Sequence, residues 1–242
     1  MTDERCVIFD LDGVLVDSEP HWRAGFRETV DTLATGAGLE PPGIPDDELV
    51  AYEGGRVPDT LAALVRDYLP SLHPLSPALL QEATDTCVAA SSARIAATPR
   101  TIEDSVRAAR DLHDAGYTLA VASSSARPFI DAALSSVGLD DVFEVRESAF
   151  DVDHAKPHPE VYLKAMAGLR TDPTRCVAIE DSVTGVRASL AAGLSTIWRT
   201  DAPRTLDGVV PQSEHARTSP APRPWLISVT QVSSDTIVSA FP

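Results

Sequence analysis

Lysine is scarce in this chain of 242 residues, which has only Lys156 and Lys164 among its 20 basic residues. Arginine supplies the rest of the positive charge. Because lysine carries a compact point charge and arginine a planar fork, the two are not interchangeable, and an isolated lysine indicates a site that needs the compact charge. No lysine lies between residues 13 and 98. Chemistry that forms a Schiff base with a lysine is therefore excluded from that stretch.

Cysteine is also scarce, and long apolar runs are missing. Cys6, Cys87 and Cys176 lie far apart and without metal-ligand spacing, which favours reduced structural thiols over disulfides. No apolar run approaches the roughly 20 residues of a membrane-spanning helix. The chain begins Met-Thr-Asp-Glu-Arg, which is charged and acidic and lacks the basic start and apolar stretch of a signal peptide. We therefore expect a cytoplasmic protein that makes no contact with membranes.

Positive charge as a whole is outweighed by negative charge. The chain has 36 acidic and 20 basic residues, so its net charge is −16. A surface of this sign argues against nucleic acid and anionic membranes as partners. A small anionic substrate stays compatible, because a local cation can outweigh the field of the whole protein. We expect a small-molecule partner and a monomer or weak homodimer.

The pattern of apolar residues predicts an α/β protein with a helical insert. A short buried strand over 5–10 is followed by helical periodicity without a strand up to residue 98, and strands then alternate with helices. This pattern predicts a Rossmann-like parallel sheet with helices on both faces, built from residues 1–17 and 98–200, and an all-helical cap over 18–97. The expected helices cover 19–36, 46–53, 58–69, 77–97, 101–115, 127–137, 158–168 and 182–192; the later strands cover 118–122, 142–145, 176–179 and 195–198.

The alternation of strands and helices ends at the tail of the chain, residues 201–242. Residues 202–224 are rich in proline, a composition typical of irregular segments. Residues 225–238 alternate loosely and predict a late strand or a hairpin.

The first expected strand, Cys6-Val-Ile-Phe, ends in Asp10-Leu-Asp12-Gly. Asp10 would lie at the carboxyl end of a central strand, where open α/β sheets place their ligands. Two carboxylates this close repel each other unless a positive charge lies between them. A divalent cation with oxygen ligands is one such partner, although Asp and Gly also suit an ordinary surface turn.

Polar residues at three further points favour the cation. Ser123 ends one strand, Glu180 and Asp181 end another, and Lys156 follows a third. In a parallel sheet these strand ends share one edge, so the side chains would gather there. Four carboxylates and one lysine suit Mg²⁺ and a phosphate group. One carboxylate would attack phosphorus, while another would protonate the leaving group and later activate water.

These residues, in this order, resemble the haloacid dehalogenase-like hydrolase superfamily: Asp10-Leu-Asp12-Gly-Val, Ser123, Lys156-Pro and Glu180-Asp181-Ser-x-x-Gly185. The resemblance covers residues 5 to about 200. It implies that Asp10 is a nucleophile that forms an aspartyl-phosphate and that Asp12 is the general acid and base. It implies phosphate binding by Lys156 and by Ser123, with the adjacent Ser124 as a second candidate. The residues it implies for the metal are Asp10, the main-chain carbonyl of Asp12, Asp181 and, directly or through water, Glu180.

Single residues separate the branches of this superfamily. The dehalogenases lack an acid at the position of Asp12, and the phosphonatases need a lysine in the cap, which this chain lacks. Phosphatases and phosphomutases remain. The stretch Asp17-Ser-Glu-Pro-His21-Trp resembles sugar-phosphate phosphatases, and Gly54-Gly-Arg56 resembles the cap loop that closes on the substrate. His21 and Arg56 are thus candidates for substrate contact, whereas Trp22 is expected in the core of the cap.

The leading hypothesis is a magnesium-dependent phosphatase that hydrolyses a small sugar or polyol phosphate. The alternative is a phosphomutase of the beta-phosphoglucomutase type, which needs the same site. A third hypothesis, a non-catalytic binder of metal and phosphate, is kept because the tail does not resemble the usual end of this family.

Overall fold

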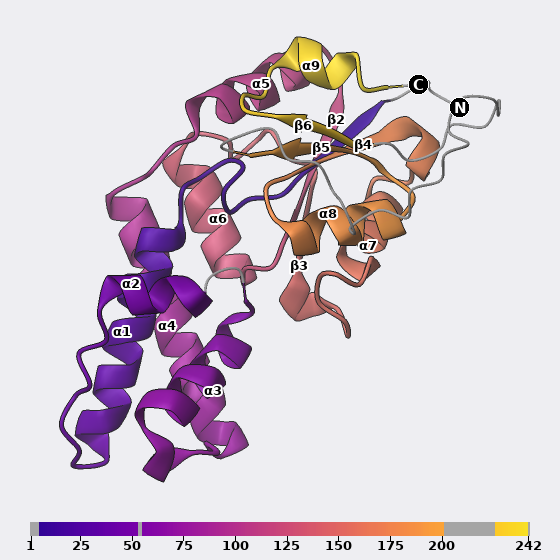
Figure 1. Cartoon of the computed structure of the whole chain (residues 1–242). Coiled ribbons are helices and arrows are strands. Elements are labelled where there is room, and N and C mark those ends of the chain that lie inside the picture. Colours follow the sequence, from indigo (N-terminus) through magenta and orange to yellow (C-terminus); the bar gives the residue numbers. More distant parts are fainter. Residues whose placement is uncertain (1–4, 53–54, 201–225, 242) are drawn as a thin grey trace.

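The structure is a computed structural model that describes residues 5–52, 55–200 and 226–241. A parallel sheet with its covering helices forms one part of the molecule, and a group of helices at the start of the chain forms the other (Figure 1). The described strands lie in the order β3-β2-β1-β4-β5-β6, so the first strand is central. Their bounds are β1 Cys6–Phe9, β2 Thr118–Ser123, β3 Val145–Ser148, β4 Cys176–Glu180, β5 Ser195–Arg199 and β6 Leu226–Val229.

The central strand is buried on both faces of the sheet. Val7 and Phe9 belong to one cluster of apolar side chains, and Cys6 and Ile8 belong to another. This division follows from the alternation of side chains along a strand. Helices α5 (Glu103–Asp114) and α6 (Arg127–Ser136) contribute to the first cluster, and α7 (Glu160–Gly168) and α8 (Val183–Ala191) to the second. The predicted parallel sheet with helices on both faces is confirmed.

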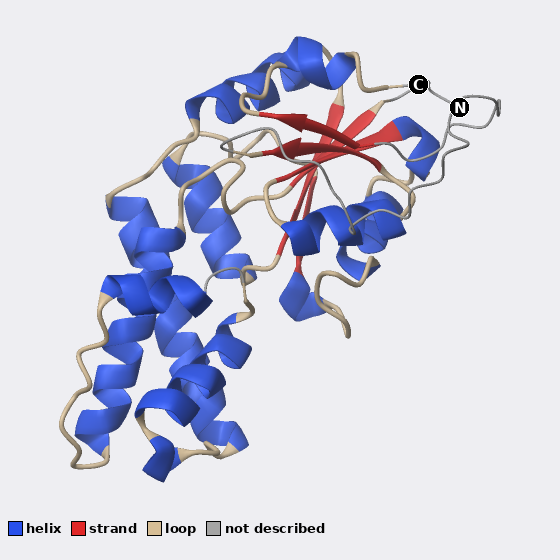
Figure 2. Cartoon of the chain, viewed as in Figure 1, coloured by secondary structure: helices blue, strands red, loops and turns tan. Residues whose placement is uncertain are grey.

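The segment between β1 and α5 forms the helical cap and contributes no strand to the sheet among its described residues (Figure 2). Along its first helix, the residues Trp22, Phe26 and Val30 are buried, as their helical spacing predicts. The predicted all-helical cap is confirmed. Its helices are α1 (Glu19–Gly36), α2 (Asp46–Leu49), α3 (Val57–Tyr68) and α4 (Pro77–Ala97), with 3₁₀ turns at Val50–Tyr52 and Pro70–Leu72.

The two connections between sheet and cap run side by side. The amide of Asp17 donates to the carbonyl of Arg100 at 2.8 Å, and the amide of Ile102 donates to that of Leu15 at 3.0 Å. The side chains of Arg100 and Asp17 form an ion pair at 2.6 Å. The chain thus leaves the sheet and returns to it at the same place.

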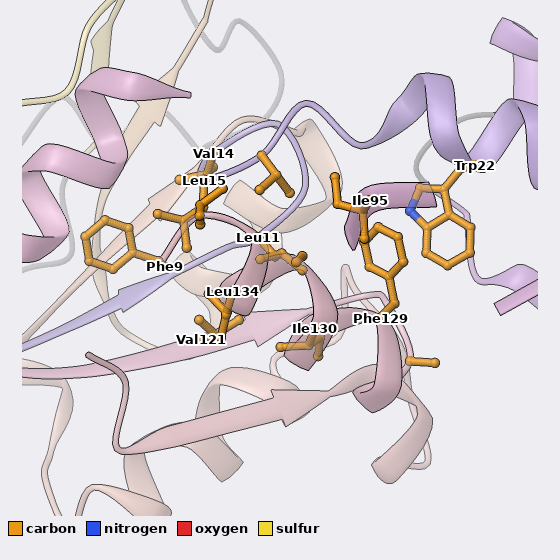
Figure 3. Close-up of a cluster of buried hydrophobic side chains, with 14 of the residues drawn as sticks. Phe9, Leu11, Val14, Leu15, Trp22, Ile95, Val121, Phe129, Ile130 and Leu134 are labelled. Atoms are coloured by element: carbon orange, nitrogen blue, oxygen red, sulfur yellow. The ribbon is translucent and has the colours of Figure 1, made fainter. Parts of the chain in front are cut away.

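Sheet and cap also share one hydrophobic cluster. The ring of Trp22 in the cap lies 4.3 Å, centroid to centroid, from the ring of Phe129 in α6. Figure 3 shows these two rings beside Ile95 of α4, with Phe9 and Leu11 further into the sheet. The cap is therefore packed against the core and not merely tethered to it.

The expected strand over 142–145 is wrong in its position, because β3 begins at Val145 and ends at Ser148. The apolar residues that suggested it are buried for another reason. Phe143 lies before the strand and packs edge-on against Phe9, with ring centroids 5.7 Å apart. The apolar side chain of Phe143 indicated a strand in the sequence, although this residue is buried in a loop.

Most of the tail that we predicted over 201–242 lies outside the described residues. In the part that the structure describes, β6 pairs in parallel with β5, and the short helix α9 (Ser234–Val238) buries Ile237 in the first cluster. The domain boundaries given above stay a prediction. Among the described residues, none of the helices combines the length and the apolar character that crossing a bilayer requires.

Candidate active site

The carboxyl ends of β1, β2 and β4 bring the predicted polar residues to one edge of the sheet. Asp10 directly follows β1, Ser123 ends β2 and Glu180 ends β4, and all three are buried. The amide of Asp10 continues the ladder by donating to the carbonyl of Ile179 at 2.9 Å, so the backbone fixes its position. This is the edge at which open parallel sheets bind ligands.

Lys156 joins the two strands by bridging their carboxylates. Its Nζ lies 2.7 Å from Oδ1 of Asp10 and 2.7 Å from Oε1 of Glu180. A third bond runs to the carbonyl of Ala122 at 2.9 Å, so each ammonium proton has an acceptor. Burial by itself would lower the pKa of Lys156, but the two carboxylates outweigh it and hold that pKa above its usual value. The lysine therefore stays charged at the centre of the site.

Glu180 is held from both sides of its carboxylate. Its Oε1 also accepts a bond from the hydroxyl of Tyr162 at 2.5 Å, and its Oε2 accepts bonds from the amide of Asp181 at 3.2 Å and the hydroxyl of Ser182 at 3.3 Å. A Cβ at Gly185 would lie 1.9 Å from Oε1, so only glycine leaves room for this carboxylate. These contacts position Glu180 to hold Lys156.

Asp12 accepts hydrogen bonds from four side chains. The hydroxyls of Ser123 and Ser125 donate to its Oδ2 at 3.1 and 2.8 Å. Its Oδ1 accepts from the indole of Trp22 at 3.2 Å and from the hydroxyl of Ser18. The donors come from both the sheet and the beginning of the cap. The orientation of Asp12 thus depends on where the cap lies.

Asp10, Glu180 and Asp181 offer carboxylate oxygens that all lie within 4.8 Å of one another. Burial and the neighbouring Glu180 raise the pKa of Asp181 to about 7, which reflects the cost of gathering negative charge here. A hard divalent cation would offset that cost, and oxygen donors are the ligands that Mg²⁺ prefers. The donor set therefore fits magnesium, with Asp10 and Asp181 as the carboxylates that have oxygens to spare.

Gly13 makes room for Asp181. Its φ is +76°, and a Cβ there would lie 1.9 Å from Oδ2 of Asp181. We expect Gly13→Ala to displace this carboxylate and to raise the Mg²⁺ concentration that gives half-maximal hydrolysis at least tenfold. A magnesium titration of the rate measures this.

Gly116 provides a matched control for that substitution. Its φ is +85°, and a Cβ there would meet nothing within 4 Å. Because the two φ values are similar, Gly116→Ala and Gly13→Ala should each cost about 1–2 kcal/mol of backbone strain. Gly116→Ala should leave the magnesium requirement unchanged. If both variants need the same magnesium as the parent, the proposed role of Gly13 is wrong.

A cavity opens beside these residues at the boundary between sheet and cap. Asp10, Asp12, Lys156 and Asp181 line it, together with Ser124. Ser123 is fully buried and its hydroxyl faces Asp12, so Ser124 is the better placed of the two serines to contact a ligand. The cap contributes the acid Glu19 and a set of mostly apolar residues, namely Trp22, Phe26, Tyr52, Gly55 and Val57.

The two cap residues predicted to contact substrate are not among those that line the cavity. His21 is buried at the start of α1, and burial lowers its pKa. Arg56 precedes α3, with its guanidinium carbon 5.7 Å from the ring centre of Phe150. Their proposed contact with substrate stays a prediction.

The sequence did not predict several side-chain contacts in the site. They include the bonds of Trp22, Ser125 and Ser18 to Asp12 and of Tyr162 to Glu180. Ser125 follows Ser123 and Ser124 in a run of three serines, so the sequence held a signal for it. Trp22 and Tyr162 lie on helices at apolar positions, and nothing in the spacing distinguishes them from core residues.

Comparisons with known proteins identify the family of this chain. The model of the haloacid dehalogenase-like hydrolase family matches residues 4–193. Hexitol phosphatase B of Escherichia coli (strain K12) is 34% identical over 194 residues, covering 78% of this chain and 81% of the relative. The structure of CbbY from Rhodobacter sphaeroides in complex with phosphate covers 93% of both chains, with a TM-score of 0.70 and 23% identity.

A beta-phosphoglucomutase from Clostridium difficile shares the fold at a TM-score of 0.67 and 20% identity, covering 81% of this chain and 84% of its own. At this identity the likeness concerns the fold alone. The family model spans most of the chain, and the matched residues include Lys156 and the two carboxylates that it bridges, Asp10 and Glu180. The chain therefore belongs to the haloacid dehalogenase-like hydrolase family and is a hydrolase.

Proposed function

We propose that this hydrolase is a magnesium-dependent phosphatase that acts on a small sugar or polyol phosphate through an aspartyl-phosphate. The observation that carries the proposal is the geometry around Lys156, whose ammonium bridges Asp10 and Glu180 beside a cavity that Asp12 also lines. A charged lysine and two acids in different surroundings, Asp10 and Asp12, therefore line the same cavity. Phosphoryl transfer uses a nucleophile, a proton donor and positive charge in one place.

Asp10 is the proposed nucleophile. Burial raises its pKa strongly, which would favour the protonated and unreactive form, but Lys156 acts in the opposite direction. The ion pair at 2.7 Å opposes protonation without cancelling it, because Glu180, Asp181 and Asp12 also raise the pKa of Asp10, which stays well above its usual value. Asp10 and Asp181 would hold Mg²⁺, which would supply positive charge to the phosphate oxygens. Lys156 holds the nucleophile in place and lessens its repulsion of the phosphate.

Asp12 is the proposed acid and base. Unlike Asp10 it has no lysine partner, and its carboxylate is oriented by neutral hydroxyl and indole donors. Because no cationic side chain is bonded to it, we assign to Asp12 the transfer of a proton to the leaving oxygen and the later removal of a proton from water. The two acids thus differ in function because their surroundings differ.

The lining of the cavity supports the proposed substrate class. Glu19 and the aromatic and aliphatic side chains of the cap face a floor of acids and Lys156, which suits a compact substrate with a phosphate at one end and polar groups at the other. A relative at 34% identity bears the name hexitol phosphatase, which supports sugar and polyol phosphates in particular. We propose that the cap opens to admit the substrate and closes to exclude bulk water.

Removal of magnesium should abolish this activity. We expect chelation by EDTA to reduce phosphate release at least 100-fold and added Mg²⁺ to restore it, because the carboxylate cluster repels an anionic ester without the cation. The measurement is release of inorganic phosphate from hexitol and hexose phosphates and from p-nitrophenyl phosphate.

Two outcomes would contradict the proposal. One is the absence of turnover on a broad panel of phosphate esters with magnesium present. The other is conversion of glucose 1-phosphate into the 6-phosphate with little free phosphate, which would indicate a mutase. Retained activity on calcium chelation alone, with EGTA in the presence of Mg²⁺, is the control.

A further inference from the structure

A second group of metal-ligating side chains lies outside the active site. His154 and His158 belong to the loop before α7, and Glu160 is the first residue of that helix. Nδ1 of His154 lies 3.0 Å from Oε2 of Glu160, and Nδ1 of His158 lies 3.6 Å from the same oxygen. All three ligand atoms lie within 4.8 Å of one another. The cluster faces solvent, since the histidine side chains are 66% and 50% exposed.

The distances from the two imidazole nitrogens to Oε2 of Glu160 are close to those between neighbouring ligands of one zinc ion. Zn²⁺ binds imidazole nitrogen and carboxylate oxygen at about 2.0–2.1 Å in tetrahedral geometry, which places neighbouring ligand atoms about 3.3 Å apart. The observed separations of 3.0 and 3.6 Å lie on either side of that value. Little movement of the side chains is needed to admit the ion.

The carboxylate at the centre of the cluster is already oriented. The amides of Asp153 and His154 donate to Oε1 and Oε2 of Glu160, each at 3.0 Å. These bonds favour the charged carboxylate and restrict its rotation. The imidazole rings lie 4.5 Å apart, centroid to centroid. A simple ion pair between His154 and Glu160 would not require the second imidazole to lie there.

We propose that His154, His158 and Glu160 form a binding site for a borderline transition-metal cation, with Zn²⁺ as the ion and water in its fourth position. The nitrogen donors distinguish this site from the oxygen cluster of Asp10 and Asp181, which suits Mg²⁺. Lys156 lies between the two histidines in the chain. A bound ion would tie together the loop that carries this lysine without touching the lysine itself.

Zinc titration of untagged protein tests the proposal, with excess Mg²⁺ present to occupy the oxygen cluster. We expect the parent to bind one zinc ion by isothermal titration calorimetry, and His154→Ala and His158→Ala to weaken that binding at least tenfold. His113→Ala is the matched control, because this histidine is also exposed (46%) and also lies beside an acid, Asp114, at 3.7 Å. Equal zinc affinity in the parent and in both loop variants would overturn the proposal.

Two further measurements separate this site from the proposed active site. Zinc should raise the unfolding temperature of the parent and of Asp10→Asn, but not that of His154→Ala. His154→Ala should hydrolyse phosphate esters at the parental rate in magnesium alone. If Asp10→Asn removes zinc binding and His154→Ala does not, the ion binds in the oxygen cluster and the histidine site is wrong. Failure of the phosphatase activity would leave the zinc result unaffected.

Discussion

Replacing Asp10 with asparagine is expected to reduce phosphate-ester hydrolysis by about 10⁴-fold or more, the loss typical of removing a nucleophile. Asparagine has nearly the same shape, so the change removes the attacking oxygen with little effect on packing. Lys156 would keep its second partner, Glu180, at 2.7 Å, and a buried ion pair would remain. We therefore expect the variant to fold and to lose activity for a chemical reason.

Steady-state phosphate release with magnesium measures this effect, and circular dichroism checks the fold. Asp172→Asn is a suitable control, because this carboxylate is 58% exposed and only caps the 3₁₀ turn Pro173–Arg175 before β4. It should retain the parental rate. A rate for Asp10→Asn above about a tenth of the parental value would mean that Asp10 does not attack phosphorus.

Lys156→Met is expected to have the second large effect, on stability as well as on activity. The methionine side chain fills a similar space but leaves Asp10 and Glu180 buried without their shared cation. Breaking a buried ion pair from one side typically costs about 3–5 kcal/mol. The loss should be greater in EDTA than in Mg²⁺, because a bound divalent cation would offset part of the missing charge. Denaturant unfolding in both conditions measures it.

The only other lysine of the chain makes the control. The side chain of Lys164 is 42% exposed and pairs with Glu147 at 3.0 Å. Lys164→Met should therefore change the unfolding free energy by no more than about 1 kcal/mol. Similar unfolding midpoints for the two variants would show that the bridge at Lys156 contributes no stability.

The strands and the edge of the sheet were predictable because their signals are local. Three buried apolar segments end in polar residues, and parallel pairing then places Asp10 beside Glu180 without further information. The two lysines stood out by rarity alone, and the one before Pro157 forms the central bridge. Apolar periodicity likewise predicted the helices of the cap within a few residues.

The remaining features depend on contacts between distant segments. Trp22 was expected in the core of the cap and is indeed buried, but its indole nitrogen also bonds to Asp12. Apolar periodicity reports the burial of a ring and not the direction of its N–H. Phe143 misled the placement of β3 for a related reason, since its burial against Phe9 needs no strand. One sequence does not distinguish these cases, because both depend on which segments become neighbours.

The paired connections between sheet and cap have a mechanical consequence. The two connecting segments lie next to each other and are joined by the backbone bond from Asp17 to Arg100. They therefore form one hinge and not two independent flexible linkers. Neither connection contains glycine over residues 14–18 or 98–101, and the second contains Pro99. A cap that opens would therefore swing about one axis, and the same swing would carry Trp22 away from Asp12. Opening of the cavity and loss of the bond that orients Asp12 would then occur in the same movement.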